Sequence, residues 1–503
     1  MFLFFRMLLI MGVSLFTTRL VLETLGVEDF GIYNVVGGIV LLLTFLNSAM
    51  VSATQRFLSF ELGRKNYFKL RKTFSISINL HILIGVLVLL LAETVGLWFL
   101  NTKMNIPEAR MEAARWVYQF SIFSFLISII RVTYNAAIIA NEKMSFFAYN
   151  SILESILKLL VVFTLVWSGD IDKMKLYSIL TFTVTTIVTA IYICYCFFKF
   201  KECRYYYVWD KKIFNSLINF SGWSIFGSFS WVLMNQGVNI LLNVFFEPTI
   251  NAARAIAFQV NSSVSLLVTN FKTAVNPQII KSHSSGDKHY MDMLVFESSK
   301  YSYYLILLLV LPFLLETETI LNLWLNSSPD YAIIFSQLLL VNTLFQSFDI
   351  GIVFTAIGKI KANQFFGGMT YLLVLPLSYV FVKCGYPPEI TFFINIAATI
   401  VVNFFINIIL LKKYTEITPY RYFDLLLSPI LKVTIISCLL PLLINLIIVS
   451  STERLLLTTF TSILSVLSTV YFFGINNKTR NIILRATKNL IRTRLLNKSN
   501  NSN

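Results

Sequence analysis

Two stretches of the sequence decide how the chain is organised: LGVEDFGIYNVVGGIVLLLTFLNSAMVSATQRF at residues 25–57 and FEPTINAARAIAFQVNSSVSLLVTNFKTAVNPQ at residues 246–278. They align without a gap at a shift of 221 positions, and each joins an acid-containing start to an apolar run and a polar loop. A second pair, NAAIIANEKMSFF at 135–147 and IVFTAIGKIKANQ at 352–364, aligns at a shift of 217. Two matches in the same order indicate a duplicated unit of six helices, with the two copies parallel.

The composition indicates that this unit lies in a membrane. Hydrophobic residues make up 56% of the 503 residues and charged residues only 13%, which is more apolar surface than a water-soluble core can bury. Runs of about 20 apolar residues, long enough to span a bilayer as helices, occur about fourteen times. They lie at about 3–22, 32–54, 74–99, 115–138, 147–168, 175–198, 217–245, 250–272, 300–323, 332–356, 366–383, 390–411, 426–449 and 455–474.

We therefore predict an all-α integral membrane protein with about fourteen transmembrane helices. Residues 1–210 and 211–425 are expected to form two six-helix lobes around a central cavity, and 426–474 two additional helices. Residues 475–503 form a basic tail, either an amphipathic helix on the anionic inner leaflet or a disordered segment. The apolar run after Arg6 meets no small-residue cleavage site, so we expect the first span there rather than a signal peptide.

Loop charges predict the orientation. Residues 56–72 carry six bases and one acid, residues 199–212 five bases and two acids, and the tail after 474 seven bases and no acid. The alternate loops are poor in bases, so the positive-inside rule places both termini in the cytoplasm. This asymmetry explains most of the net charge of +16, and binding to nucleic acid is not expected because the bases are scattered over loops.

Sequence motifs of enzymes and metalloproteins do not occur. The five cysteines and three histidines have no metal-ligand or redox spacing, and no Walker motif or nucleophile elbow is present. We therefore expect neither an enzyme nor a resident cofactor.

Seven stretches of the sequence resemble a known family: TRLVLETLGVEDFGIYNVVGGIV, ATQRFLSFELG, YNAAIIANEKM, FSGW, QGVNILLNVFFEPTINAARAIAFQV, NPQIIKS and TAIGKIK. They are similar to signature stretches of Wzx-type flippases for O-antigen or capsule repeat units. These belong to the multidrug/oligosaccharidyl-lipid/polysaccharide (MOP) exporter superfamily. The resemblance runs from about residue 7 to about 420. Glu247 departs from it where Gly is usual, and Val132-Thr133 departs where Pro is common.

The resemblance implies a function in lipopolysaccharide or capsule biosynthesis. Such a protein would turn an undecaprenyl-diphosphate-linked oligosaccharide from the cytoplasmic to the outer leaflet of the bacterial inner membrane by alternating access. It would work as a monomer in the bilayer, beside the glycosyltransferases and the polymerase of the same pathway. Three alternatives stay open: a cation-coupled drug or metabolite exporter of the same superfamily, a peptidoglycan-precursor flippase, and a polymerase or ligase. The polymerase or ligase would need a large outer loop, and none exceeds about twenty residues.

Polar residues inside predicted spans are the candidates for binding this substrate, because charges there usually face an aqueous cavity. Guanidinium groups bind phosphate in pairs and amides bind sugar hydroxyls. The predicted cavity residues are Arg19, Arg131, Arg254, Asn251, Asn261 and Asn270. Two alternatives are that Arg254 reaches the outer interface or pairs with Glu247, and that Arg131 pairs with Glu154 at a similar depth on the next span.

Further charges are candidates for ion coupling and for substrate capture. Asp349, Glu154 and Lys158 are the predicted Na⁺- or H⁺-coupling groups, although Glu154 and Lys158 are spaced i, i+4 and can neutralise each other. Asp349 has no base nearby in sequence, and helix packing is its alternative role. At the cytoplasmic exits, Arg56, Arg64, Lys65 and Lys272 are predicted to gather the diphosphate, or only to signal topology.

Overall fold

The computed structural model describes residues 44–102, 106–169, 171–246, 248–325, 331–448 and 451–476, with separate positions between 9 and 37 and Arg480. Arg19, the side chain of Asn251 and the tail from residue 481 onwards lie outside the described residues, so the predictions for them stay untested. The chain divides into two compact units. Unit 1 comprises Met1–Val238, Thr269–Val295 and Gly351–Leu377, and unit 2 comprises Asn239–Val268, Phe296–Ile350 and Ser378–Asn503. The lobe boundaries predicted from the repeat differ from these units and stay a prediction.

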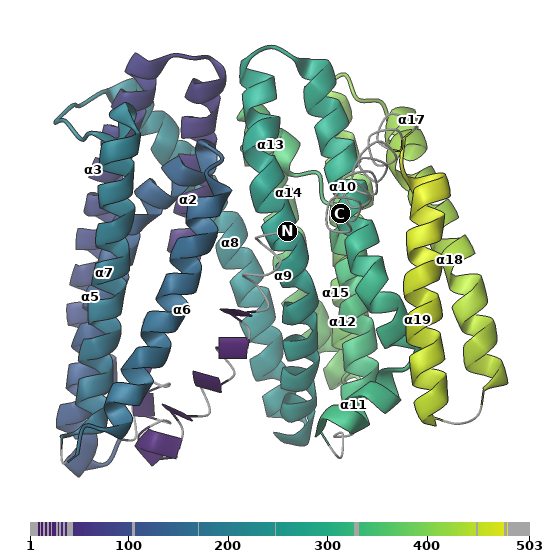
Figure 1. The fold of residues 1–503 in the computed structure, drawn as a ribbon, viewed down its shortest axis with the longest axis horizontal. Helices are drawn as coiled ribbons and strands as arrows, with labels where there is room; N and C mark the ends of the chain where they lie inside the picture. The colour runs from purple at the N-terminus through teal and green to yellow at the C-terminus, as the bar shows by residue number, and fades with distance from the viewer. Residues whose placement is uncertain are drawn as a thin grey trace, which may run out of the picture. The chain divides into compact units, whose positions relative to one another are not determined.

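The first part of the chain forms long helices, and those up to residue 199 run side by side at the purple and blue end of Figure 1. They are α2 (Thr44–Gly63), α3 (Tyr67–Leu91), which continues through a π-helical turn (Ala92–Gly96) into α4 (Leu97–Thr102), α5 (Glu108–Ala140), α6 (Met144–Val166), α7 (Lys173–Lys199) and α8 (Lys211–Phe245). Local sequence sets several starts: Asn66 caps α3 by accepting from the Lys69 amide at 3.0 Å, and Asp172 caps α7 by accepting from Met174 and Lys175.

The second part of the chain is also helical. It contains α9 (Pro248–Ser284), α10 (Lys288–Leu315), α11 (Thr317–Leu325), α12 (Ala332–Gln346), α13 (Ile352–Ile357), α14 (Ile360–Lys383), α15 (Ile390–Ile400), α16 (Asn407–Tyr414), α17 (Pro419–Tyr422), α18 (Ser428–Ile447) and α19 (Ser451–Thr469). In unit 2, α18 and α19 lie side by side (Figure 1). The buried Glu316 carboxylate fixes them, because it accepts hydrogen bonds from Asn445 at 2.9 Å and from Arg454 and Thr458 at 3.0 Å each.

Ten of the described helical stretches are long and apolar enough to span a membrane, which confirms the all-α membrane fold. The first two predicted spans lie largely outside the described residues. The eighth is α9, a continuous helix of 37 residues that is too polar to count by composition.

The predicted span 332–356 is wrong as a single helix. It is α12 and α13, separated by a turn in which the Asp349 amide donates to the Gln346 carbonyl at 3.1 Å. Asp349 is exposed at this break. Asp349 therefore lies in a turn and not within a helix, because α12 ends three residues earlier, and its role in ion coupling stays a prediction.

Small residues let helices approach closely around α5, which packs on α2, α3, α6 and α7. Ala113, Ala114, Ala136, Ala137 and Ala140 are all buried on it. Such contacts matter in a bilayer because lipid tails are as apolar as leucine and burial alone gives helices little reason to associate. Exposed leucines at three- and four-residue spacing mark the opposite kind of surface, for example Leu83, Leu87 and Leu90 on α3, as expected for a face in contact with lipid.

Candidate functional site

A polar cavity of about 320 Å³ lies within unit 1. Three helices supply polar side chains to it, each at the three- and four-residue spacing that keeps side chains on one helix face. They are Ser121, Ser124, Ser128 and Arg131 on α5, Glu154 and Lys158 on α6, and Ser178, Thr181 and Thr185 on α7. Tyr33, Gly37, Phe120 and Phe125 complete the wall. The cavity is therefore rich in hydroxyl groups with a single cluster of charges.

The charged cluster is built on one carboxylate. Arg131 Nη1 lies 3.3 Å from Glu154 Oε2, and Lys158 Nζ lies 2.8 Å from Glu154 Oε1. Both pairs considered from the sequence are therefore present, and two cations share one anion. The side chains are 24% exposed for Arg131 and Glu154 and 49% for Lys158, so these pairs are weaker than dry ones and can exchange partners.

The hydroxyl groups on α7 are held by their own helix. Ser178 donates to the Lys175 carbonyl at 2.7 Å, Thr181 to the Tyr177 carbonyl at 2.7 Å, and Thr185 to the Thr181 carbonyl at 3.0 Å. A hydroxyl oxygen that donates in this way can still accept hydrogen bonds. These residues were not predicted from the sequence, although their spacing of three and four within an apolar helix is a signal for them.

Arg254, the predicted outer cavity residue, lies on α9 in unit 2 in different surroundings. It is 9% exposed, its Nη1 donates to Asn239 Oδ1 at 3.0 Å, and its guanidinium lies 4.3 Å from the centre of the Phe258 ring. An amide and an aromatic face therefore hold this charge. Glu247, its predicted alternative partner, lies outside the described residues.

The predicted sugar-binding amides are divided between the units. Asn261 belongs to unit 2 and accepts a hydrogen bond from Thr343, whereas Asn270 belongs to unit 1. Their contact with a sugar stays a prediction.

The residues predicted to gather a diphosphate differ in how free they are. Arg56 is 9% exposed and donates to the Thr355 carbonyl, whereas Arg64 and Lys65 are exposed at the turn after α2. Arg64 lies 4.5 Å from the Phe60 ring centre, and Lys272 is half-buried on α9. Of the residues in this turn, Arg64 and Lys65 are the better placed to meet an anion from solution.

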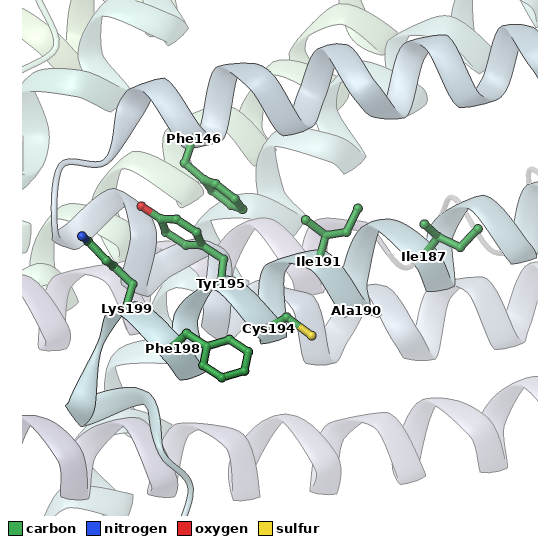
Figure 2. A pocket seen from close by; sticks show the side chains of 8 residues that line it. All are labelled: Phe146, Ile187, Ala190, Ile191, Cys194, Tyr195, Phe198 and Lys199. Atoms are coloured by element: carbon green, nitrogen blue, oxygen red, sulfur yellow. The ribbon is translucent and has the colours of Figure 1, made fainter.

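A second concavity of unit 1 is an apolar groove of about 640 Å³ on α7 and α6. Figure 2 shows Phe146 facing Tyr195, with ring centres 3.7 Å apart, and Lys199 at one end of the groove. Cys194 lies nine residues after Thr185, about two and a half turns, so groove and cavity use opposite faces of α7. The lining suits a hydrocarbon chain.

No group of three or more His, Cys, Asp or Glu side chains that could hold a metal ion occurs in the described part of the chain.

No protein-family model matches the sequence, and no curated protein matches it.

Solved structures do match this architecture. A MATE in the straight conformation superposes with a TM-score of 0.70 at 13% identity, over 81% of this chain and 95% of that one. An outward-facing multidrug resistance MATE family transporter of the MOP superfamily gives 0.69 at 13%, over 80% and 92%. The chain has the MATE transporter fold. A MOP superfamily transporter from Pyrococcus furiosus, described as having a binding pocket of reverse polarity that suggests a different function, gives 0.68 at 14%, over 82% and 96%.

The shared fold is that of an all-helical, multi-pass membrane protein. At 13–14% identity the likeness shows the fold alone, so the substrate must be argued from the cavity.

Proposed function

We propose that the protein is a flippase for undecaprenyl-diphosphate-linked oligosaccharides. It would turn repeat units from the cytoplasmic to the outer leaflet of a bacterial inner membrane, with both termini in the cytoplasm, for O-antigen or capsule biosynthesis. The glycosyltransferases that build the repeat unit would supply the substrate, and the polymerase would consume it.

The observation that carries the proposal is the polarity of the cavity in unit 1. Arg131 and Lys158 share the Glu154 carboxylate, so the described cavity carries one net positive charge among hydroxyl groups and aromatic rings. A sugar presents hydroxyl groups that both donate and accept hydrogen bonds, together with apolar ring faces, and a diphosphate presents anionic oxygens. The walls therefore match both parts of a sugar diphosphate.

The geometry suggests how the head group is held. Each Glu154 oxygen forms an ion pair with one cation, and a diphosphate has more anionic oxygens than a carboxylate. When the diphosphate enters, it replaces the carboxylate as partner of Arg131 and Lys158, because a guanidinium binds phosphate through two parallel hydrogen bonds. A cavity of about 320 Å³ is at the lower end of the range for ligand pockets and holds part of the head group at a time.

An exporter of cationic compounds is the second candidate, since the matching structures include multidrug transporters. Such an exporter needs an acidic cavity, whereas the only acid among the cavity residues described is already shared by two bases. The Pyrococcus furiosus protein is described as having reversed pocket polarity that suggests a different function, which supports polarity as the property that separates substrates in this fold. Coupling to Na⁺ or H⁺ through Glu154 is compatible with either candidate.

The proposal is tested by transport in proteoliposomes. We expect wild type to move a prenyl-diphosphate oligosaccharide across the bilayer, and Arg131→Ala to be slower by about 100-fold, the loss of one or two charge-assisted hydrogen bonds. Lys175→Ala is the matched control, because it also removes a base from an ion pair of unit 1, with Glu112, away from the cavity. Wild type that ignores the lipid-linked sugar and exports small cations would establish the second candidate instead.

A further inference from the structure

The two sequence repeats meet each other within unit 1, at the end of its helices that carries the turns 63–67, 141–144, 284–288 and 357–360, here called the basic end. The first contact joins α2 and α9. A Cβ atom added to Gly63, the last residue of α2, would lie 2.6 Å from the Lys281 carbonyl oxygen and 2.8 Å from Lys281 Cα. Only glycine permits two helix backbones to approach this closely.

The second contact is polar and joins the turn after α5 to the helical turn of α9 that contains Lys281. Glu142 accepts a hydrogen bond from Gln278 through one oxygen and forms an ion pair with Lys281 through the other. Glu142 has a φ of 59°, in the left-handed region that non-glycine residues rarely adopt. The turn therefore holds a costly conformation while this carboxylate is engaged.

The third contact joins α2 to the end of α13. Arg56 Nε donates at 3.1 Å to the Thr355 carbonyl, which also accepts the Gly358 amide at 3.2 Å at the C-terminus of α13, the negative end of the helix dipole. Gly358 follows with a φ of 77°, and a Cβ atom there would lie 2.5 Å from Arg56 Nη2. The phenyl rings of Phe57, Phe60 and Phe220 surround the guanidinium at 4.4–5.4 Å.

These contacts are related by the internal repeat. A shift of 221 positions carries residue 63 onto residue 284, whose hydroxyl oxygen is also next to the added Cβ of Gly63, so equivalent positions touch each other. Contact between equivalent residues is what a two-fold axis produces when it passes between them. The same operation carries Gln278 back onto residue 57, and a shift of 217 carries Glu142 onto residue 359. Each is one residue from the third contact, between Arg56 and Gly358.

We propose that the three contacts form a gate at the basic end, with the two turns acting as paired latches on either side of the α2–α9 crossing. The proposal rests on the proposed function in one respect: a flippase that loads its substrate at the basic end must part these contacts in each cycle. The gate suits reversible opening, because each latch consists of a few polar bonds. The side chains of Glu142 and Lys281 are 31% and 23% exposed, whereas Arg56 in the other latch is buried. Equivalent latches on both sides would let the repeats separate symmetrically.

Charge reversal combined with hydrogen–deuterium exchange tests the gate in the full-length protein in detergent or nanodiscs. We expect Glu142→Lys to speed amide exchange in residues 60–66 and 279–287 by about tenfold, since losing a coupling contact shifts an opening equilibrium by that order. The double variant Glu142→Lys with Lys281→Glu restores the pair and should return exchange to within about twofold of wild type. Glu142→Gln, which keeps the side-chain size, covers the case in which the reversed charge prevents folding.

A reversal of the exposed pair Glu112 and Lys175 is the matched control and should leave exchange at the basic end unchanged. Wild-type exchange in both Glu142 variants, or failure of the double variant to restore protection, would overturn the gate. Failure of the proposed substrate is separable from this result: if the oligosaccharide is not transported while exchange responds as expected, the gate stands and the substrate assignment falls.

Discussion

Two arginines in predicted spans meet opposite surroundings in the two units. Arg131 in unit 1 is 24% exposed at the side chain, and it shares a carboxylate with a second cation in a cavity lined by hydroxyl groups. Arg254 in unit 2 is 9% exposed, with an amide oxygen on one side and a phenyl ring on another. The first site can exchange one anion for another, whereas the second is buried against an amide and an aromatic ring.

A charge in a span is therefore not by itself a sign of ligand binding. A membrane charge that costs about 2.5–3.5 kcal/mol on insertion scales needs partners, and those partners decide its role. An anionic partner at a partly exposed site competes with an anionic ligand, whereas a buried guanidinium is less accessible to such a ligand. Variants of the two sites can test this contrast.

The largest effect is expected from removing the shared carboxylate. Glu154→Ala leaves Arg131 and Lys158 close together without an anion, and should lower the free energy of unfolding by about 1–3 kcal/mol, less than for a dry pair because both pairs are partly exposed. Inorganic pyrophosphate should then raise the thermal unfolding temperature of the variant more than that of wild type, by replacing the missing carboxylate.

Thermal unfolding of the purified protein with and without pyrophosphate measures this response, with sulfate at equal ionic strength as the control. Equal responses of variant and wild type would mean that Glu154 does not compete with anions, and would contradict the proposal that a diphosphate replaces this carboxylate in the cavity.

The charged cluster of this cavity could be predicted from the sequence, whereas its hydroxyl groups and the burial of Arg56 were not predicted. Apolar runs located most spans, and the i, i+4 spacing of Glu154 and Lys158 predicted their pairing, because both signals are local. The burial of Arg56 was not predictable, since its acceptor Thr355 is 299 positions away. The exposed position of Asp349 depends on where α12 ends, and no glycine or proline within α12 announces that end.

A smaller effect is expected at Arg254. Arg254→Met keeps an unbranched side chain against Phe258 and removes a charge from the membrane. The lost contacts of the guanidinium and the relieved cost of burying its charge should offset each other, so the free energy of unfolding should stay within about 1 kcal/mol of wild type. Because the guanidinium is buried against Asn239 and Phe258, transport per folded molecule should stay within about threefold of wild type. The assay is the proteoliposome measurement used for Arg131→Ala.

A loss of transport as large as that of Arg131→Ala, with stability unchanged, would remove the contrast between the two sites. Arg254 would then handle substrate, as the sequence analysis predicted.

The smallest effect is expected at an ion pair outside the spans, which shows what such a pair contributes in water. Lys72 Nζ lies 2.6 Å from Asp210 Oδ2, and the side chains are 23% and 24% exposed, close to the values for Arg131 and Glu154.

The hydrogen bond from Lys72, with those from the Ile213 and Lys212 amides, lowers the pKa of Asp210. A lowered pKa means that the ionised carboxyl favours the folded state above the usual Asp value of about 3.9, and that this contribution disappears as the pH falls through the lowered value. Lys72→Ala should therefore lower the thermal unfolding temperature slightly at pH 7 and pH 5, and the difference from wild type should shrink below about pH 4. A difference that persists unchanged at low pH would assign the effect to packing of the lysine stem, and the pair would no longer serve as an aqueous reference for the cavity.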